Sequence, residues 1–238
     1  MSWVYKMKPK VLAVVPARAG SKRLPQKNIK PLNGLPLIAY TFEAIKQSEY
    51  ITATIATSDC PEVLRVSEQY ENTYPLNRPA ELASDTASSI DVVLHAVEFA
   101  KRLGMFDVIC LLQPTSPLRT TQDIDSAIAL YIEKQAKGVV SLTKCQHSPQ
   151  WTTSLDTDIE FKQFIKGLTN TRSQDLTEFY QLNGAIYLID RARLLSTKKL
   201  FLEDDYYPFI MAEKNSIDID TEMDFIMANI LMSKGRCD

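Results

Sequence analysis

The 238-residue sequence is poor in glycine, histidine and cysteine, and each shortage argues against a class of site. Its seven glycines form neither the G-x-x-x-x-G-K-[ST] phosphate loop nor the G-x-G-x-x-G dinucleotide fingerprint. The two histidines and the four cysteines (Cys60, Cys110, Cys145 and Cys237) show no C-x-x-C or Cys–His spacing. A zinc site or a disulfide framework is therefore not expected.

Long apolar runs and an excess of one charge are also missing. No 18-residue apolar span occurs, and the first eight residues are too polar and too few for a signal peptide, so no membrane partner is expected. The 27 basic and 29 acidic residues give a net charge of −2, which does not favour nucleic acid. We therefore expect a cytoplasmic enzyme that binds any anion locally.

Apolar periodicity indicates an α/β fold. The runs at 51–56, 108–112, 139–142 and 185–189 are short and rich in β-branched residues, as in buried strands. Apolar residues between these runs fall at helical spacing, and Thr120-Thr-Gln-Asp123 resembles a helix N-cap. This alternation predicts one domain over residues 9–238, with a mostly parallel sheet and helices on both faces.

Residues 145–182 break this alternation and are predicted to be an insertion. The segment contains His147-Ser-Pro149, an Asp156-Thr-Asp158 turn and a polar stretch through Thr177. It also contains more apolar side chains than a solvated loop needs, including Trp151 and Phe161. We expect the insertion to pack either on its own domain or on a partner subunit.

The most informative segment is the apolar run Val11–Val15 followed by a cationic loop. Ala19, Gly20 and Ser21 are small enough to let a ligand approach the backbone, while Arg18, Lys22, Arg23 and Lys27 supply positive charge. A solvated basic loop is the simpler interpretation. Its place after a buried strand, where open α/β sheets bind ligands, favours an anion site.

The acidic segment Ile217-Asp-Ile-Asp220 suggests a metal site. In an extended strand Asp218 and Asp220 would point to one face, about 6.5 Å apart, while both isoleucines would face the core. Magnesium binds through one or two carboxylates together with substrate phosphates. The alternative is an acidic helix start, stabilised by the helix dipole.

Two further segments carry polar groups that suit a nucleotide. Residues 78–90 combine Arg78 with several hydroxyl groups before a predicted helix, although helix capping alone would explain Ser88 and Ser89. Residues 111–119 end a buried strand with Gln113, whose amide can both donate to and accept from a pyrimidine edge.

Five segments in this order resemble the acylneuraminate cytidylyltransferases, which activate sialic acid and related nine-carbon sugars as CMP conjugates. The segments span nearly the whole chain: 16–28, 78–89, 112–119, 183–187 (Asn-Gly-Ala-Ile-Tyr) and 216–222 (Ser-Ile-Asp-Ile-Asp-Thr-Glu). The resemblance implies a Rossmann-like nucleotidyltransferase sheet. It also implies that the sugar's anomeric 2-hydroxyl attacks the α-phosphorus of CTP and that pyrophosphate leaves.

The resemblance implies roles for individual residues. It assigns catalysis to Arg18, Lys27, Asp218 and Asp220, and the last two would bind Mg²⁺ or Mn²⁺. It assigns nucleotide binding to Arg18, Ser21, Lys22, Asn28, Arg78, Ser89 and Gln113. The sugar, a nonulosonic acid, would contact Gln113, Arg172, Gln181, Tyr187 and Phe201, and the 145–182 insertion would exchange between the subunits of a homodimer.

The chain departs from the family pattern near the end of the insertion. Family members often carry arginine at Ser173, proline at Thr177 and arginine at Gln181. The lost charge at Gln181 suggests a modified acid such as legionaminic acid rather than N-acetylneuraminic acid. Two alternatives stay open: a cytidylyltransferase for 3-deoxy-manno-octulosonate, and a nucleotide-binding regulator without turnover.

Overall fold

The sheet has one antiparallel strand among parallel ones. The computed structural model describes residues 8–234 apart from Lys22, Asp85, 156–157, 168–171 and 173–175. Within that part, seven strands form one sheet in the order β5-β4-β1-β6-β8-β7-β9, and β8 alone runs opposite to the rest. The strands are β1 (Val11–Pro16), β4 (Ile51–Ser58), β5 (Thr73–Asn77), β6 (Val108–Leu112), β7 (Gly138–Lys144), β8 (Tyr180–Asp190) and β9 (Tyr206–Ile210). The expected mostly parallel α/β sheet is confirmed.

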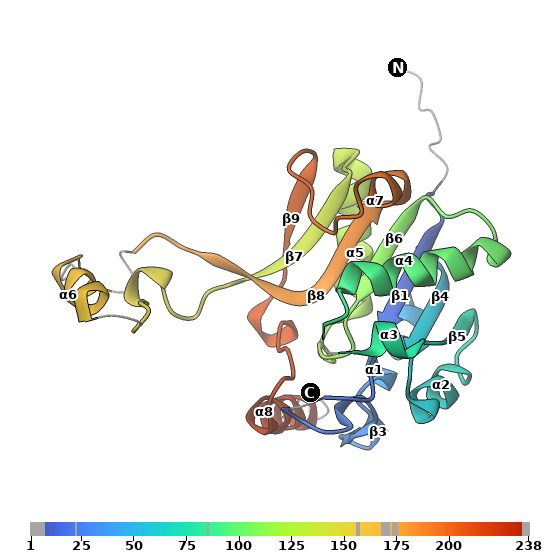
Figure 1. Ribbon diagram of the computed structural model, residues 1–238, viewed down its shortest axis with the longest axis horizontal. Helices are drawn as coiled ribbons and strands as arrows, with labels where there is room; N and C mark the ends of the chain where they lie inside the picture. The colour runs from blue at the N-terminus through green and yellow to red at the C-terminus, as the bar shows by residue number, and fades with distance from the viewer. Residues whose placement is uncertain are drawn as a thin grey trace.

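Helices cover both faces of this sheet (Figure 1). On one face, side chains of β1 such as Val11 and Val15 pack with α1 (Ala39–Lys46), α2 (Pro61–Ser67) and α5 (Thr121–Lys134). On the other face, Leu12 and Val14 pack with α4 (Ser89–Ala100) and α7 (Arg191–Thr197). Because β1 is apolar at every position, it can be buried on both sides at the centre of the sheet.

A third, smaller core joins the two ends of the chain. Here α8 (Glu222–Lys234) packs beside the two-stranded hairpin of β2 (Pro31–Leu32) and β3 (Leu35–Pro36). Leu24 from the cationic loop and Ile219 from the acidic segment are both buried in this core. The packing brings two segments nearly 200 residues apart in sequence to the same edge of the sheet.

Side-chain caps fix the start of two helices. Thr120 caps α5 through a reciprocal capping box with Asp123, as the sequence predicted. Ser88 accepts a hydrogen bond from the backbone of Asp91 at the start of α4. The capping interpretation is therefore confirmed for Ser88, while Ser89 begins the helix itself.

The segment predicted as an insertion extends from the sheet as an arm (Figure 1). It carries a 3₁₀ turn at Pro149–Trp151 and α6 (Asp158–Gly167), and it returns through the first residues of β8. Leu155, Phe161 and Ile165 are exposed on this arm. Nothing else in the described part of the chain covers these apolar side chains.

Some elements differ from the sequence prediction. Residues 217–220 form an irregular segment rather than a strand, although Ile219 is fully buried as expected. The helix α3 (Ala80–Ala83) and the edge strands β5 and β9 were not predicted. Within the described residues, no helix has both the length and the apolar character needed to cross a membrane.

Candidate active site

A cavity of about 330 Å³ opens at the carboxyl edge of the sheet, between the ends of β1 and β6. From β1 the chain continues to β4 and β5 on one side, and then crosses to β6 on the other. The loops after β1 and β6 therefore diverge at this point, which is where open α/β sheets bind ligands. The cavity lies at the end of β1, where the sequence predicts an anion site.

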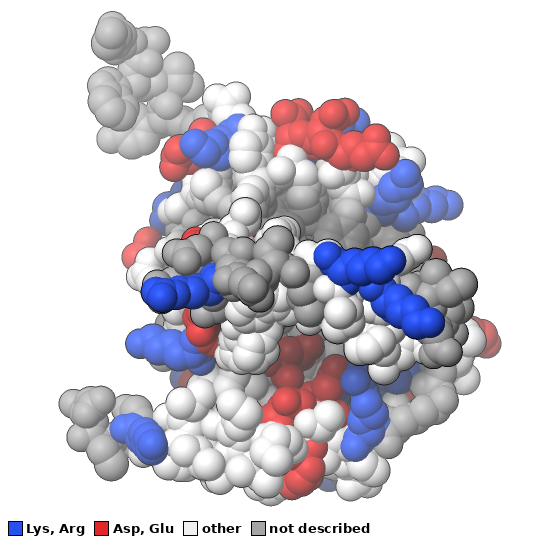
Figure 2. Space-filling view, turned by 90° about the vertical axis from the view of Figure 1, so that its left-hand side faces the viewer, with Lys and Arg blue, Asp and Glu red and all other residues white. Residues whose placement is uncertain are grey.

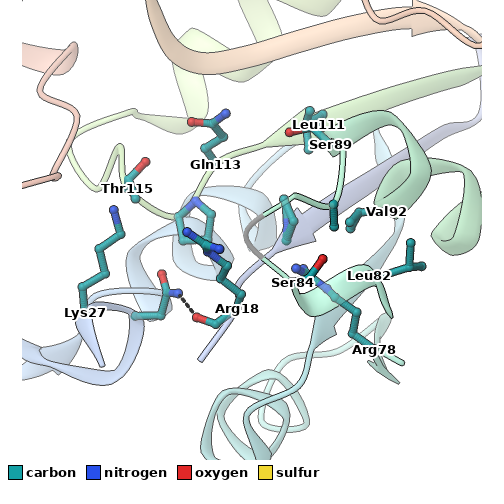
Figure 3. A pocket seen from close by; sticks show the side chains of 14 residues that line it. Arg18, Lys27, Arg78, Leu82, Ser84, Ser89, Val92, Leu111, Gln113 and Thr115 are labelled. Atoms are coloured by element: carbon teal, nitrogen blue, oxygen red, sulfur yellow. Dashed lines mark hydrogen bonds between the residues drawn. The ribbon is translucent and has the colours of Figure 1, made fainter. Parts of the chain in front are cut away.

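Six of the residues predicted for nucleotide binding or catalysis line the cavity together (Figure 3). They come from three of the five segments: Arg18, Lys27, Asn28, Arg78, Ser89 and Gln113. Ser84, Leu82, Val92, Leu111 and Thr115 complete much of the wall. Three cations and several hydroxyl and amide groups therefore face one volume, which suits a phosphorylated polar ligand.

Asn28 lines the cavity and contacts the backbone of the cationic loop. Its side-chain nitrogen donates to the carbonyl oxygen of Arg18 at 3.1 Å (Figure 3). Its Oδ1 atom is buried and has no hydrogen-bond partner among the residues that the structure describes. A buried amide oxygen in this state is an acceptor left for a ligand hydroxyl or N–H group.

Arg78 supplies a positive charge from within the protein. The side chain is buried, and its Nη2 donates to the carbonyl oxygen of Thr57 at 2.7 Å. Burial lowers the pKa of Arg78, whereas the nearby carboxylate of Asp59 acts in the opposite direction. A desolvated guanidinium of this kind interacts more strongly with an anion than a solvated one does.

Gly184 allows Gln113 and Asp218 to approach the same point of β8. A Cβ atom at Gly184 would lie 2.9 Å from Gln113 Oε1 and 3.6 Å from Asp218 Oδ2. The glycine also adopts a φ of +72°, a conformation that other residues rarely adopt. Both observations favour glycine at position 184, between the cavity and the acidic segment.

Lys27 connects the cavity with the acidic segment directly. Its ammonium group donates to the carbonyl oxygen of Ile219 at 2.8 Å and to Asp220 Oδ1 at 3.0 Å. Arg23 binds the second carboxylate oxygen of Asp220 at 2.7 Å. In this structure, two cations of the loop after β1 therefore neutralise the carboxylate predicted to bind metal.

The carboxylate of Asp218 lies next to the hydroxyl of Thr115. Desolvation raises the pKa of Asp218, the Thr115 hydroxyl opposes this by hydrogen bonding, and the negative charge of Asp220 raises it further. The two carboxylates thus interact unfavourably with each other, which a bound cation would relieve.

The donor set fits magnesium. Among the described residues, no group of three or more acidic, histidine or cysteine side chains is placed to hold a metal ion. Two carboxylates alone do not form a full ligand cage, but they match the way Mg²⁺ is bound when phosphates and water provide the other ligands.

An aromatic cluster forms around Tyr187 on β8. The ring of Tyr187 packs edge-on against Phe201 at 5.8 Å, and Phe201 also contacts Tyr206. Burial raises the pKa of Tyr187, and the charge of Asp218 adds to this effect. Phe201 remains about half exposed, so the cluster offers an aromatic surface next to the acidic segment.

Of the other predicted residues that the structure describes, none lines the cavity. Ser21 lies on the same loop but outside the lining set. Lys22 lies outside the described residues. Arg172 and Gln181 belong to the arm, where Gln181 is exposed, pairs with Thr143 across β7 and β8, and contacts Cys145.

Sequence reasoning did not single out Thr115 and Arg119 as site residues. Thr115 lines the cavity and holds Asp218 through its hydroxyl and Ile219 through its carbonyl. Arg119 is fully buried and donates to the carbonyl oxygens of Gln113 and Ala185 and to the Thr41 hydroxyl. Both belong to the 111–119 segment, where hydroxyl groups and an arginine directly after a buried strand could have indicated further site residues.

Basic and acidic side chains are interspersed on the face of the molecule from which the arm projects (Figure 2). Figure 2 shows the face towards which the arm points, where basic side chains lie among acidic and neutral ones. They form no continuous basic stripe on that face, within the residues described.

Comparison with protein families gives one match over most of the chain. A family described as Cytidylyltransferase matches residues 12–226. Among curated proteins, the chain is 34% identical to the CMP-N,N'-diacetyllegionaminic acid synthase of Legionella pneumophila, over 95% of this chain and 98% of that protein.

Other relatives have related names. The chain is 36% identical to the N-acylneuraminate cytidylyltransferase of Escherichia coli, over 96% of this chain but 53% of that protein, so it spans about half of that relative. It is 32% identical to the pseudaminic acid cytidylyltransferase of Campylobacter jejuni, over 93% and 96% of the two chains.

Two solved structures share the fold at low identity. A CMP:2-keto-3-deoxy-manno-octonic acid synthetase complexed with CTP aligns with a TM-score of 0.69 at 17% identity, over 95% of this chain and 99% of that one. A 4-diphosphocytidyl-2C-methyl-D-erythritol synthase from Anaerococcus prevotii aligns with a TM-score of 0.65 at 16% identity, over the same shares. Both share the overall α/β fold of this chain.

Proposed function

Because the chain belongs to the cytidylyltransferase family, we propose that it condenses CTP with a nine-carbon 2-keto-3-deoxy sugar acid to give the CMP-sugar and pyrophosphate. The observation that carries this proposal is the convergence of Arg18, Lys27 and Arg78 on one cavity beside two carboxylates. Two relatives align with the chain over nearly their full length, and their names refer to legionaminic and pseudaminic acids.

The cavity residues position the nucleotide for displacement at phosphorus. Arg18, Lys27 and Arg78 neutralise the triphosphate, while Asn28 Oδ1 and the Gln113 amide receive polar groups of the nucleoside. The bond from the sugar's O2 to the α-phosphorus forms as the bond to pyrophosphate breaks, and the hydroxyl proton is released. Such transfers depend mainly on alignment and on neutralising the charge of the leaving group.

Asp218 and Asp220 would hold a magnesium ion. When bound, it would stabilise negative charge on the phosphate oxygens. Asp220 also accepts a hydrogen bond from Lys27, which lines the cavity, so the proposed metal ligands lie next to the proposed triphosphate site. Thr115 and Gly184 keep Asp218 beside Gln113.

The sugar acid would bind beside the cavity, at the aromatic cluster of Tyr187 and Phe201. Tyr187 pairs across the sheet with Leu111, which lines the cavity, and its ring packs against Phe201. Arg172 and Gln181 lie on the arm, away from the cavity of their own chain, so they would act in the site of a second copy. We therefore propose a homodimer in which the exposed apolar residues of each arm pack on the partner.

The two alternatives have less support. The octulosonate enzyme shares the fold at 17% identity, whereas the curated relatives named for nine-carbon acids are 32–36% identical. A regulator without turnover would not need Asp218 and Asp220 next to Lys27. It would bind CTP and release no pyrophosphate with any acid.

A panel of sugar acids tests the proposed function. We expect magnesium-dependent pyrophosphate release from CTP with at least one of N-acetylneuraminic, legionaminic and pseudaminic acids, and none after EDTA. The octulosonic acid and a sample without sugar serve as controls. Turnover with the octulosonic acid alone would replace the proposal by that alternative, and CTP binding without turnover would favour the regulator.

The choice among nine-carbon acids is expected to depend on Gln181. A neutral amide does not compensate a carboxylate as arginine does, so we expect the wild type to prefer legionaminic acid. We expect Gln181→Arg to shift the ratio of kcat/KM towards N-acetylneuraminic acid by about tenfold, the size of one charge-assisted hydrogen bond. A wild type that strongly prefers N-acetylneuraminic acid would contradict this hypothesis.

Gly184→Ala is expected to damage the site through a single methyl group. The new Cβ would clash with Gln113, and the φ of +72° would cost about 1–2 kcal/mol of stability. We expect kcat/KM for CTP to fall about tenfold or more, since small displacements of positioned groups are costly. The matched control is Gly34→Ala, which has a φ of +94° but no neighbour within 4 Å, so it should lose stability and retain activity. Equal activity losses in both variants would refute a specific role for Gly184.

A further inference from the structure

The buried amide of Asn183 has a fixed orientation. Asn183 lies on β8 and is 4% exposed. Its Oδ1 accepts hydrogen bonds from the Ser141 hydroxyl at 2.6 Å and from the Ala185 N–H at 3.2 Å. Since both partners are placed to donate, the oxygen must face them and the NH₂ group must face the other way.

The NH₂ group of Asn183 is directed at the segment that leads to the two carboxylates. It donates to Ser216 Oγ at 3.0 Å, and Ser216 in turn donates to the carbonyl oxygen of Ala212 at 2.8 Å. Ser216 precedes Asp218 by two residues. One side chain of the sheet is thus linked, through one hydroxyl, to the start of the acidic segment.

This link matters because residues 216–220 have no regular structure. Their position depends on a few contacts with other elements. The Ile219 N–H donates to the Thr115 carbonyl at 2.8 Å, and Asn215 donates to Asp123 Oδ2 at 3.0 Å. Asn183 adds a contact from β8, at the residue before the glycine that Gln113 and Asp218 flank.

We infer that Asn183 is a positioning residue that fixes the acidic segment against the cavity through Ser216. For catalysis this inference rests on the proposed function, since the segment would carry the metal ligands. The link from Asn183 through Ser216 to the acidic segment does not depend on the proposed function. Loss of the link should let residues 212–220 open more often and hold Asp218 and Asp220 less accurately.

The test compares Ser216→Ala with Ser216→Thr and wild type. Ser216→Ala removes the linking hydroxyl from a half-buried position, and Ser216→Thr retains it. The matched control is Ser196→Ala, which removes a serine that also donates to a nearby backbone carbonyl, but on α7. Asn183→Asp, which keeps the acceptor oxygens and loses the donor, tests the link from its other end.

Two measurements are made on each full-length variant. The first is hydrogen–deuterium exchange of peptides covering residues 212–220, with peptides from β1 and β7 as internal references. We expect about fivefold faster exchange of 212–220 in Ser216→Ala and Asn183→Asp, the size of one net hydrogen bond, with the β1 reference unchanged. The second is the magnesium concentration that gives half-maximal pyrophosphate release, which should rise severalfold while KM for CTP stays within twofold.

The outcomes separate this inference from the proposed function. A wild type without pyrophosphate release would refute the proposed function, and the exchange data would still decide whether Asn183 fixes the segment. The inference would be overturned if exchange of residues 212–220 were unchanged in both Ser216→Ala and Asn183→Asp. It would also be overturned if exchange became faster to the same degree in all peptides. Ser216→Thr should behave as wild type, and a loss equal to that of Ser216→Ala would also overturn it.

Discussion

Asp220→Asn is expected to reduce the turnover of pyrophosphate release on the order of 100-fold, comparable to removing one preorganised group that stabilises transition-state charge. The substitution deletes a charge and almost no volume, so the fold should persist. The structure adds a less obvious expectation. Because Lys27 and Arg23 both bind this carboxylate, its loss releases two cations towards the cavity, and KM for CTP should stay level or fall. Steady-state kinetics over a range of magnesium concentrations would measure both effects.

Glu222→Gln provides the matched control for this variant. Glu222 lies two residues further along the same segment and forms an exposed ion pair with Lys30. Exposed pairs contribute little, about 0–1 kcal/mol, so this variant should keep near-normal kinetics. If Asp220→Asn retained turnover within threefold of wild type at low and high magnesium, Asp220 would not be a metal ligand.

The central strands could be predicted from the sequence because burial on both sides leaves a clear signal. Val108–Leu112 is predicted with its observed bounds, and the strand at 51–56 extends only two residues further than predicted. The edge strands lack this signal. β5 contains Pro75 and β9 contains Pro208, and proline in a short apolar run normally argues against a strand unless it lies at an edge.

The acidic segment shows why a correct burial pattern can still give the wrong element. Alternating apolar and acidic residues at 217–220 predicted a strand, and Ile219 is indeed buried. Its N–H bonds to the single carbonyl of Thr115 rather than to a neighbouring strand, so no ladder forms. Alternation specifies which side chains face the core, but not which backbone groups they will pair with.

The site could be predicted as a set of residues but not as an arrangement. The cationic loop and the strand-end amide carry local signals, and the structure brings them to one cavity. The contact of Lys27 with Asp220 joins residues 193 positions apart and depends on the small core around α8. The need for glycine at position 184 likewise arises only when Gln113 and Asp218 meet there.

Arg18→Ala is expected to lower kcat/KM for CTP by about 10- to 100-fold, with kcat reduced and KM raised together. Arg18 lines the cavity next to Asn28, and charge-assisted hydrogen bonds to phosphate contribute about 1.5–3 kcal/mol. The triphosphate carries its charge both before and during the displacement, so the loss should affect binding and turnover alike.

Arg18→Lys should show a smaller loss than Arg18→Ala, because lysine keeps the charge but not the two-pronged geometry of arginine. The control is Arg65→Ala on α2, where an exposed arginine that does not line the cavity pairs with Glu62. CTP saturation curves with and without the sugar acid would separate binding from turnover. Kinetics of Arg18→Ala that match those of Arg65→Ala would place Arg18 outside the triphosphate site. The simpler interpretation of the loop after β1, a solvated basic loop, would then hold.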